Sequence, residues 1–233
     1  MIHVLDLFSG TGSVSRFCRL LPLHFETVSL EKDKKLTATI MEDILKWDYR
    51  IYKPGHFDII WASPPCTEYS IAKQKGERDL KLADKLVKRT IEIIKYFRPK
   101  VWFIENPQTG MLKDRSFMKN IPYHDVCYCK YGYPYMKPTR IWTNLRDFIP
   151  LYCKKDCKMI VSGRHLQTIG RTVLEEVPAK TTHTAKSLIN SIPPKLLQSL
   201  FVTTLSHLKC KSTTLEAVRS MRIPSTNWKK KLI

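Results

Sequence analysis

The sequence lacks an apolar stretch long enough for a transmembrane helix, and no basic leader precedes its first apolar run. Its seven cysteines are odd in number and scattered, unlike the paired cysteines of a secreted disulfide framework. We therefore expect a protein without membrane partners, located in the cytoplasm or the nucleus. In such a reducing compartment a cysteine thiol stays free to react.

Acidic residues are scarce relative to basic ones. The chain has 21 Asp and Glu against 40 Lys and Arg, which gives a formal net charge of +19. Such a surplus favours a polyanionic partner, with nucleic acid the leading candidate, and a generically basic surface is the alternative. Internal repeats are also lacking, and the 43% apolar fraction over 233 residues indicates one packed domain.

Short apolar segments alternate with longer helical patterns over the first two thirds of the chain. Residues 78–97 carry apolar side chains at helical spacing, and Pro99 ends that helix. A last helix is predicted over residues 190–201, with Pro193 and Pro194 in its first turn. Six segments are typical of strands: residues 3–8, 27–31, 57–63, 100–106, 124–129 and 139–144. The alternation predicts an α/β, Rossmann-like fold, with a mainly parallel sheet and helices on both faces. Ligands of such sheets bind beyond the carboxyl ends of the strands.

A glycine-bearing turn, SGTGS, follows the first predicted strand. Gly10 and Gly12 let the backbone approach a ligand closely, although a tight turn alone also needs glycine. A dinucleotide fingerprint is lacking, because Ser15 stands where a third glycine or alanine belongs. Glu31 ends the second strand, where an acid can bind ribose hydroxyls, and Asp43 could meet an adenine amino group. The alternative for both acids is an ordinary surface carboxylate.

A cysteine follows two prolines in the stretch SPPCTEYS, residues 63–70. Pro64 and Pro65 stiffen the chain at the end of a predicted buried strand. Cys66 is therefore either a small core residue or a nucleophile held toward a substrate.

The motifs in this order resemble those of the cytosine-C5 methyltransferase family. The most specific is the Pro-Cys dipeptide with a serine four residues later, formed by Pro65, Cys66 and Ser70. The resemblance covers nearly the whole chain to about residue 205. The resembling segments are DLFSGTGS (6–13), LEKD (30–33), EDI (42–44), SPPCTEYSIAKQKGERD (63–79), ENP (105–107), YGYPYMKPTRIW (131–142) and NSIPP (190–194).

The resemblance implies a DNA (cytosine-5)-methyltransferase that uses S-adenosylmethionine and acts on a flipped cytosine of double-stranded DNA. Cys66 would attack C6 of the base, and Glu105 would hydrogen-bond N3 and the exocyclic amine. Arg140 would hold the base or sugar near the thiol and promote thiolate formation. The residues implied to bind the cofactor are Phe8, Ser9, Gly10, Thr11, Gly12, Glu31, Asp43, Pro64, Asn190 and Ser191.

The sequence departs from the family pattern at several positions. Thr67 replaces the usual glutamine, Pro107 replaces the usual valine, and Lys137 sits near the place of the first of two arginines. Two alternatives stay open: an RNA (tRNA-type) cytosine-C5 methyltransferase, and a catalytically inactive basic nucleic-acid-binding protein. The presence of both Cys66 and Glu105 argues against the inactive protein.

Three parts are expected within a monomer. Residues 1–144 and 187–208 would form the catalytic, cofactor-binding domain, and residues 145–186 a small irregular insertion that recognises the target. Residues 209–233 carry seven Lys and Arg against one Glu, and we expect a basic, solvated and partly mobile tail.

The insertion contains possible zinc ligands. Cys153, Cys157 and His165 could provide three, with Cys127, Cys129 or His183 as the fourth ligand. A Cys-x3-Cys spacing permits a metal but is not diagnostic, and the sequence favours an insertion without metal.

Overall fold

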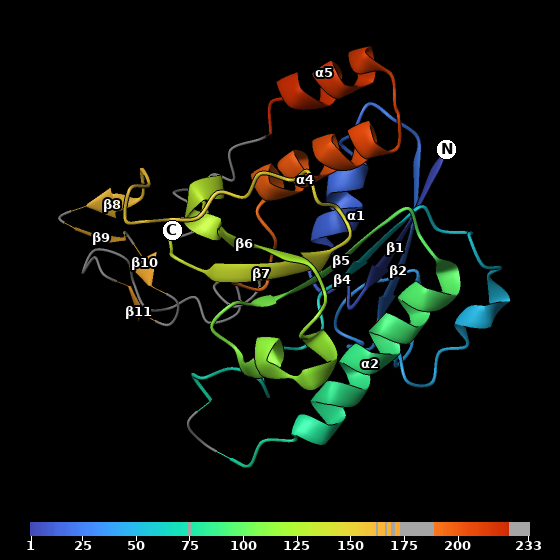
Figure 1. Cartoon of the computed structure of the whole chain (residues 1–233), viewed down its shortest axis with the longest axis horizontal. Helices are drawn as coiled ribbons and strands as arrows, with labels where there is room; N and C mark the ends of the chain where they lie inside the picture. Colours follow the sequence, from blue (N-terminus) through green and yellow to red (C-terminus); the bar gives the residue numbers. More distant parts are fainter. Residues whose placement is uncertain (74–75, 162, 166, 169–170, 173–188, 224–233) are drawn as a thin grey trace.

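The computed structural model describes residues 1–73, 76–161, 163–165, 167–168, 171–172 and 189–223. A seven-stranded sheet forms its centre, in the order β3-β2-β1-β4-β5-β7-β6 (Figure 1). The pairs among β1 to β5 are parallel, whereas β7 runs antiparallel to both β5 and β6. The strands are β1 (Ile2–Leu7), β2 (Phe25–Glu31), β3 (Ile40–Met41), β4 (Ile59–Ala62), β5 (Val101–Pro107), β6 (Tyr123–Cys127) and β7 (Pro138–Thr143).

Strand side chains alternate between two hydrophobic cores on opposite faces of the sheet. Val4 of β1 packs into one core, and its neighbours Leu5 and Leu7 pack into the other. The first core is covered by helices α1 (Ser13–Cys18) and α4 (Pro194–His207). The second is covered by α2 (Leu80–Phe97), which lies on the other side of the sheet in Figure 1. The predicted mainly parallel sheet with helices on both faces is confirmed.

Helix α2 (Leu80–Phe97) matches the predicted helical segment closely because local signals define both ends. Its N-cap residue, Asp79, accepts a hydrogen bond from the Leu82 N–H at 2.9 Å. At the other end Arg98 adopts a left-handed φ of 49°, and Pro99 follows. The helix therefore begins two residues later than the predicted residue 78.

Two predicted elements differ from the structure near the second half of the sheet. The strand predicted over residues 124–129 ends at Cys127, because Tyr128–Tyr131 turn into the 3-10 helix η4. Gly132, with a φ of 94°, ends that helix. The last predicted helix begins at Pro194 instead of residue 190, since the two prolines favour a helix start there.

Part of the predicted basic tail is a packed helix rather than solvated chain. Helix α5 (Ser212–Ser220) packs on α4, and its Val218 is fully buried. The Gln198 side chain of α4 donates hydrogen bonds to the carbonyls of Val218 and Met221 at 2.7 and 3.0 Å. These bonds satisfy carbonyl groups that a helix end otherwise leaves unpaired.

The remaining described elements are short. Two small hairpins occupy the predicted insertion, and in Figure 1 they lie beyond the side of the sheet that carries β6 and β7. No helix in the described ranges combines the length and the apolar character needed to cross a membrane. The short elements are η1 (Tyr49–Ile51), η2 (Met111–Asp114), η3 (Ser116–Met118), β8 (Ile160–Val161), β9 (Arg164–His165), β10 (Gln167–Thr168) and β11 (Arg171–Thr172).

Candidate active site

The topology predicts where a ligand should bind. The strand order reverses between β1 and β4, so the loops after these strands diverge and leave a crevice at their carboxyl ends. A cavity of about 270 Å³ opens there, whereas a second hollow along α2 contains none of the predicted site residues. The cavity is lined by Asp6, Phe8, Ser9, Gly10, Thr11, Ser13, Val14, Glu31, Lys32, Ser63, Pro64, Pro65, Cys66, Thr67, Glu105, Asn106, Pro107, Lys137, Asn190 and Ile192.

The glycine turn forms one wall of the cavity. Phe8, Gly10 and Gly12 all have positive φ values, of 57°, 51° and 68°, so the chain curls tightly before α1. The Gly10 N–H donates a hydrogen bond of 2.9 Å to a carboxylate oxygen of Glu31. Ser9 is buried, and among the described residues its hydroxyl has no hydrogen-bond partner. An unpaired buried hydroxyl in a cavity wall is what a polar ligand would satisfy.

The segment before α4 returns to this turn from the far end of the sequence. The Ile192 N–H donates to the Ser13 hydroxyl at 3.1 Å, and Asn190 and Ile192 line the cavity. Ser191 does not line it, because its hydroxyl bonds that of Tyr133 at 2.6 Å.

The loop that carries Cys66 is fixed from both sides. The Asn106 side-chain amide, at the end of β5, donates to the Pro64 carbonyl at 2.9 Å. Behind the loop Tyr69 is fully buried, and its hydroxyl donates to Asp84 at 2.8 Å. The Cys66 side chain is thereby placed at the cavity while its backbone carbonyl accepts from the Tyr69 N–H at 3.1 Å.

Glu105 is a buried carboxylate of the cavity, with 7% of its surface exposed. The Tyr128 hydroxyl donates to it at 3.0 Å, and the Lys137 ammonium nitrogen lies 4.0 Å away. Lys137 also donates to the Ile189 carbonyl at 3.0 Å and lies over the Tyr128 ring. The Lys137 ammonium and the Glu105 carboxylate therefore form a paired charge unit beside the thiol.

Burial raises the pKa of the Cys66 thiol, and the negative charge of Glu105 raises it further. The Lys137 ammonium opposes both effects and lowers the pKa of the same thiol. The resting thiol is therefore protonated at neutral pH, and Lys137 is the residue that favours its ionised form.

Arg140 does not lie where the resemblance implies. Arg140 of β7 is the register partner of Asn106 of β5, so the two side chains lie on the same face of the sheet. Glu105 precedes Asn106, and its side chain therefore lies on the opposite face. There it forms two hydrogen bonds of 2.8 Å with Asp125 and lies 3.5 Å from the Tyr123 ring centroid. Lys137, rather than Arg140, is the cation beside Glu105 and Cys66 in the cavity.

Most of the other predicted cofactor residues meet at the cavity. Asp43 does not line it: one of its oxygens accepts from the Leu45 N–H, and the other lies 4.0 Å from the ammonium of Lys32, which does line it. Gly12 shapes the turn without being part of the wall. The predicted residues that line the cavity are Phe8, Ser9, Gly10, Thr11, Glu31, Pro64, Cys66, Glu105 and Asn190.

Sequence reasoning missed a second acid of the cavity, Asp6. Burial raises its pKa to about 7, and the nearby Glu31 charge adds to the effect, opposed by the Ser15 hydroxyl, which donates to Asp6 at 3.4 Å. The motif DLFSGTGS contained the signal, since a carboxylate inside an otherwise apolar buried strand is unusual.

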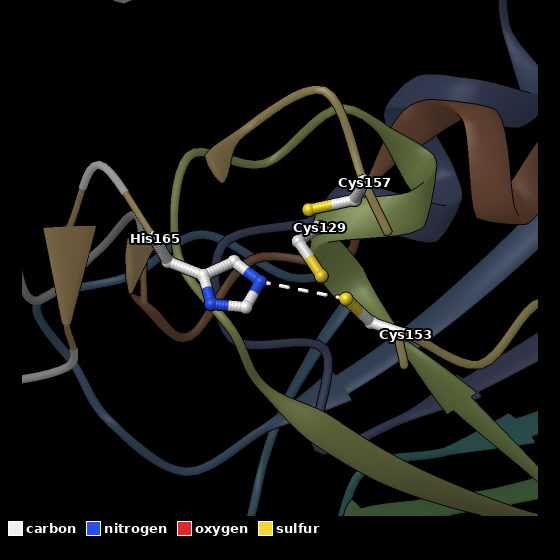
Figure 2. Close-up of side chains that lie close together, drawn as sticks. All are labelled: Cys129, Cys153, Cys157 and His165. Atoms are coloured by element: carbon white, nitrogen blue, oxygen red, sulfur yellow. Dashed lines mark hydrogen bonds between the residues drawn. The ribbon is translucent and has the colours of Figure 1, made fainter. Parts of the chain in front are cut away.

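The possible metal ligands gather away from this cavity. Side chains of Cys129, Cys153, Cys157 and His165 point toward one another beside η4 (Figure 2). His183 lies outside the described residues.

Replacing Lys137 with glutamine should raise the pKa of Cys66, because the cation that favours the thiolate is lost. The expected result is slower alkylation of Cys66 at pH 8 and a rate profile displaced to higher pH. Below the pKa, each unit of rise lowers the thiolate fraction about tenfold. Peptide mapping after iodoacetamide treatment separates Cys66 from the other cysteines. Lys137→Arg keeps the charge and should keep the profile, and an unchanged profile in Lys137→Gln would contradict this role.

Comparison with known proteins agrees with the site. Residues 2–121 match the family model described as C-5 cytosine-specific DNA methylase. A protein of frog virus 3 (isolate Goorha), described as "Probable DNA (cytosine-5)-methyltransferase", is 36% identical over 172 residues, which are 67% of this chain and 78% of the viral protein. The type II methyltransferase M.Bsp6I of Bacillus sp. (strain RFL6) is 26% identical over 82% of this chain and 61% of that protein.

Similarity to solved structures is more distant. The DNMT2 protein of Spodoptera frugiperda, in a triple-mutant form, matches 67% of this chain and 56% of its own, with 18% identity and a TM-score of 0.46. The chain thus spans about half of that structure and more than three quarters of the viral relative.

Proposed function

Because the chain belongs to the C-5 cytosine-specific DNA methylase family, we propose that it transfers a methyl group from S-adenosylmethionine to C5 of cytosine in double-stranded DNA. One observation carries the proposal: a single cavity joins the Cys66 thiol and the Glu105 carboxylate to the glycine turn and Glu31. A nucleophile and a nucleoside-type pocket therefore share one space.

The residues of the cavity fit S-adenosylmethionine. The unpaired Ser9 hydroxyl and the Glu31 carboxylate offer polar partners, and Gly10 keeps the turn close to the ligand. Asn190 and Ile192 would close the pocket on the side of the returning segment. When bound, the cofactor supplies an electrophilic methyl group to the reaction.

Cys66 would act as the nucleophile toward the cytosine ring. Its thiolate forms a bond to C6, and the electron pair of the C5–C6 double bond moves to C5 and the ring. C5 would then take the methyl group that the bound cofactor would supply, and the cofactor's sulfur would keep the electrons of the broken bond. Loss of the C5 proton to a base and departure of the Cys66 thiolate restore the double bond, so atoms and electrons balance.

Glu105 would stabilise charge on the cytosine ring, and Lys137 would favour ionisation of the Cys66 thiol. A carboxyl group in contact with N3 and the exocyclic amine stabilises the charge that arrives on the ring when Cys66 adds. The Tyr128 hydroxyl bond holds this carboxylate in place, and the Lys137 ammonium favours the thiolate.

The DNA substrate must expose a base that is hidden in the duplex. Methyltransferases of this kind extrude the target nucleotide into the active site. The basic side chains behind the formal charge of +19 would bind the flanking phosphates, so the affinity for DNA should fall steeply as the salt concentration rises.

The test of the function is bisulfite sequencing of DNA and total RNA from cells that express the protein. New protected cytosines in DNA, absent with Cys66→Ala, are the expected result. Protected cytosines in RNA alone would replace this proposal with the RNA enzyme. Protection in neither, with folded protein present, would favour a nucleic-acid-binding protein without catalysis.

Replacing Gly12 with valine should abolish cofactor binding. Gly12 has a φ of 68°, and a β-branched side chain is strained there even though the space around it is open. S-adenosylmethionine or its demethylated product should raise the Tm of the native protein, since a ligand of the folded state stabilises it. The shift should vanish in Gly12→Val. A shift with NAD and none with S-adenosylmethionine would overturn the cofactor assignment.

A further inference from the structure

A second cluster of reactive side chains lies at the junction between the main sheet and the insertion. The ligand atoms of Cys129, Cys153, Cys157 and His165 all lie within 4.8 Å of one another (Figure 2). The Nε2 atom of His165 is 3.5 Å from the sulfur of Cys153. Cys129 and Cys153 are buried, and Cys157 and His165 are partly buried.

We propose that Cys129, Cys153, Cys157 and His165 bind one structural zinc ion that anchors the insertion to the catalytic domain. Three thiolates and one imidazole form a closed tetrahedral ligand set that zinc prefers. Zinc–ligand bonds of about 2.0 to 2.3 Å place tetrahedral ligand atoms about 3.5 to 3.8 Å apart. The four atoms therefore need to close in by only about 1 Å.

The protein scaffold brings these ligands together through contacts of its own. The Cys127 N–H donates to the Leu151 carbonyl at 3.0 Å, and the Leu151 N–H donates to the Tyr131 hydroxyl at 2.9 Å. Lys130 pairs with Asp156 at 2.8 Å, which holds the loop between Cys153 and Cys157 against η4. These bonds align the loop with Cys129 before any metal binds.

The composition of the local core explains why a metal would be needed. The buried side chains at this junction are Cys127, Cys129 and Cys153, and the side chains packed on them are Met136, Cys157 and Met159. The attached hairpin of β8 and β9 has only two residues in each strand, which is too little to be stable alone. A zinc ion would supply the cross-link that this small apolar cluster does not.

The site would also restrain the catalytic cavity. Cys129 directly follows Tyr128, whose hydroxyl donates to Glu105, and both belong to η4. A metal at Cys129 would therefore fix the same short helix that orients the buried carboxylate. The existence of the site is nevertheless independent of the proposed methyl transfer.

Metal analysis tests the proposal directly. The full chain, purified without a metal-affinity tag or chelator, should contain about one zinc per chain by elemental mass spectrometry. Cys157→Ser and His165→Ala should each lose it. Cobalt substituted into the wild-type protein should give the thiolate charge-transfer bands of a tetrahedral site. This measurement needs no variant and so does not depend on how well the variants fold.

Two other cysteines serve as matched controls. Cys210→Ser removes a partly buried thiol far along the sequence, and Cys127→Ser removes a thiol whose sulfur lies 3.4 Å from that of Cys129 but outside the proposed set. Both variants should keep the metal. Folded wild-type protein without zinc and without cobalt binding, a disulfide among the proposed ligands, or metal loss in Cys127→Ser with retention in Cys157→Ser would overturn the assignment.

Removal of the metal with a chelator should change how readily the insertion is cleaved by protease. Removing zinc should accelerate proteolytic cleavage within residues 145–186 and should leave the Tm shift with S-adenosylmethionine in place, because the glycine turn lies elsewhere. Unchanged cleavage after verified metal removal would contradict the anchoring role.

Discussion

Replacing Cys66 with alanine is expected to abolish methyl transfer, with a loss on the order of 10⁴-fold or more, as for other essential nucleophiles. Cys66→Ser should be equally inactive, because a serine hydroxyl ionises far less readily than a thiol. The measurement is transfer of labelled methyl groups to DNA. Turnover at the native rate in either variant would remove the proposed mechanism.

The fold should survive this substitution. Cys66 is partly exposed, and its backbone carbonyl, not its sulfur, holds the turn to Tyr69. Alanine and serine keep that carbonyl, so the Tm and the Tm shift with S-adenosylmethionine should match those of the native protein. Cys210→Ser is the matched control and should retain turnover.

Replacing Glu105 with glutamine is expected to reduce turnover by about 10² to 10³-fold, which is the usual effect of removing one group that stabilises charge in the transition state. Glutamine keeps the size of the side chain and an oxygen that can accept the Tyr128 hydroxyl. The loss would therefore report the missing carboxyl group rather than a collapsed site.

The same substitution should act on the thiol in the opposite direction. The Glu105 charge raises the pKa of Cys66, so its removal lowers that pKa and should speed alkylation of Cys66 at neutral pH. Because unfolding would also expose the buried thiol and speed its alkylation, the variant must in addition keep the Tm of the native protein. Slower alkylation, or unchanged turnover, would contradict the role given to Glu105.

Tyr128→Phe is the matched control for the hydrogen bond. It removes the hydroxyl that donates to Glu105 and keeps the ring beneath Lys137. The expected loss of turnover is about tenfold at most, since a single hydrogen bond contributes modestly.

The sequence predicted the sheet and the position of the cavity because both depend on local patterns. The buried strand β4 (Ile59–Ala62) is a continuous apolar run, and the residues that follow such strands fall at one edge of a parallel sheet. The strand ends predicted the places of Cys66 and Glu31, the resemblance implied Glu105, and the structure brings all three to one cavity.

The side-chain directions at the antiparallel end of the sheet could not be predicted in the same way. Whether Lys137 or Arg140 faces Glu105 depends on strand register, and a shift of one residue exchanges the two faces. Spacing along the chain does not define that register.

Contacts between residues far apart in the sequence could not be predicted for a related reason. Cys129 lies 24 residues before Cys153, in a segment predicted as strand, and η4 turns it toward the insertion. Helix α5 was missed because Val218 is its only fully buried side chain and the sequence on either side of the helix is basic. In both cases tertiary packing decided the outcome.

Covalent trapping tests the central claim most directly. In DNA with 5-fluorocytosine at every cytosine, the fluorine cannot leave as a proton does, so the bond between the thiol and C6 should persist after methyl transfer. With S-adenosylmethionine present, intact mass spectrometry should show a DNA–protein adduct, and peptide mapping should locate it on Cys66. The adduct should be absent in Cys66→Ala. No adduct with the folded native protein bound to this DNA, or an adduct on another residue, would contradict the account.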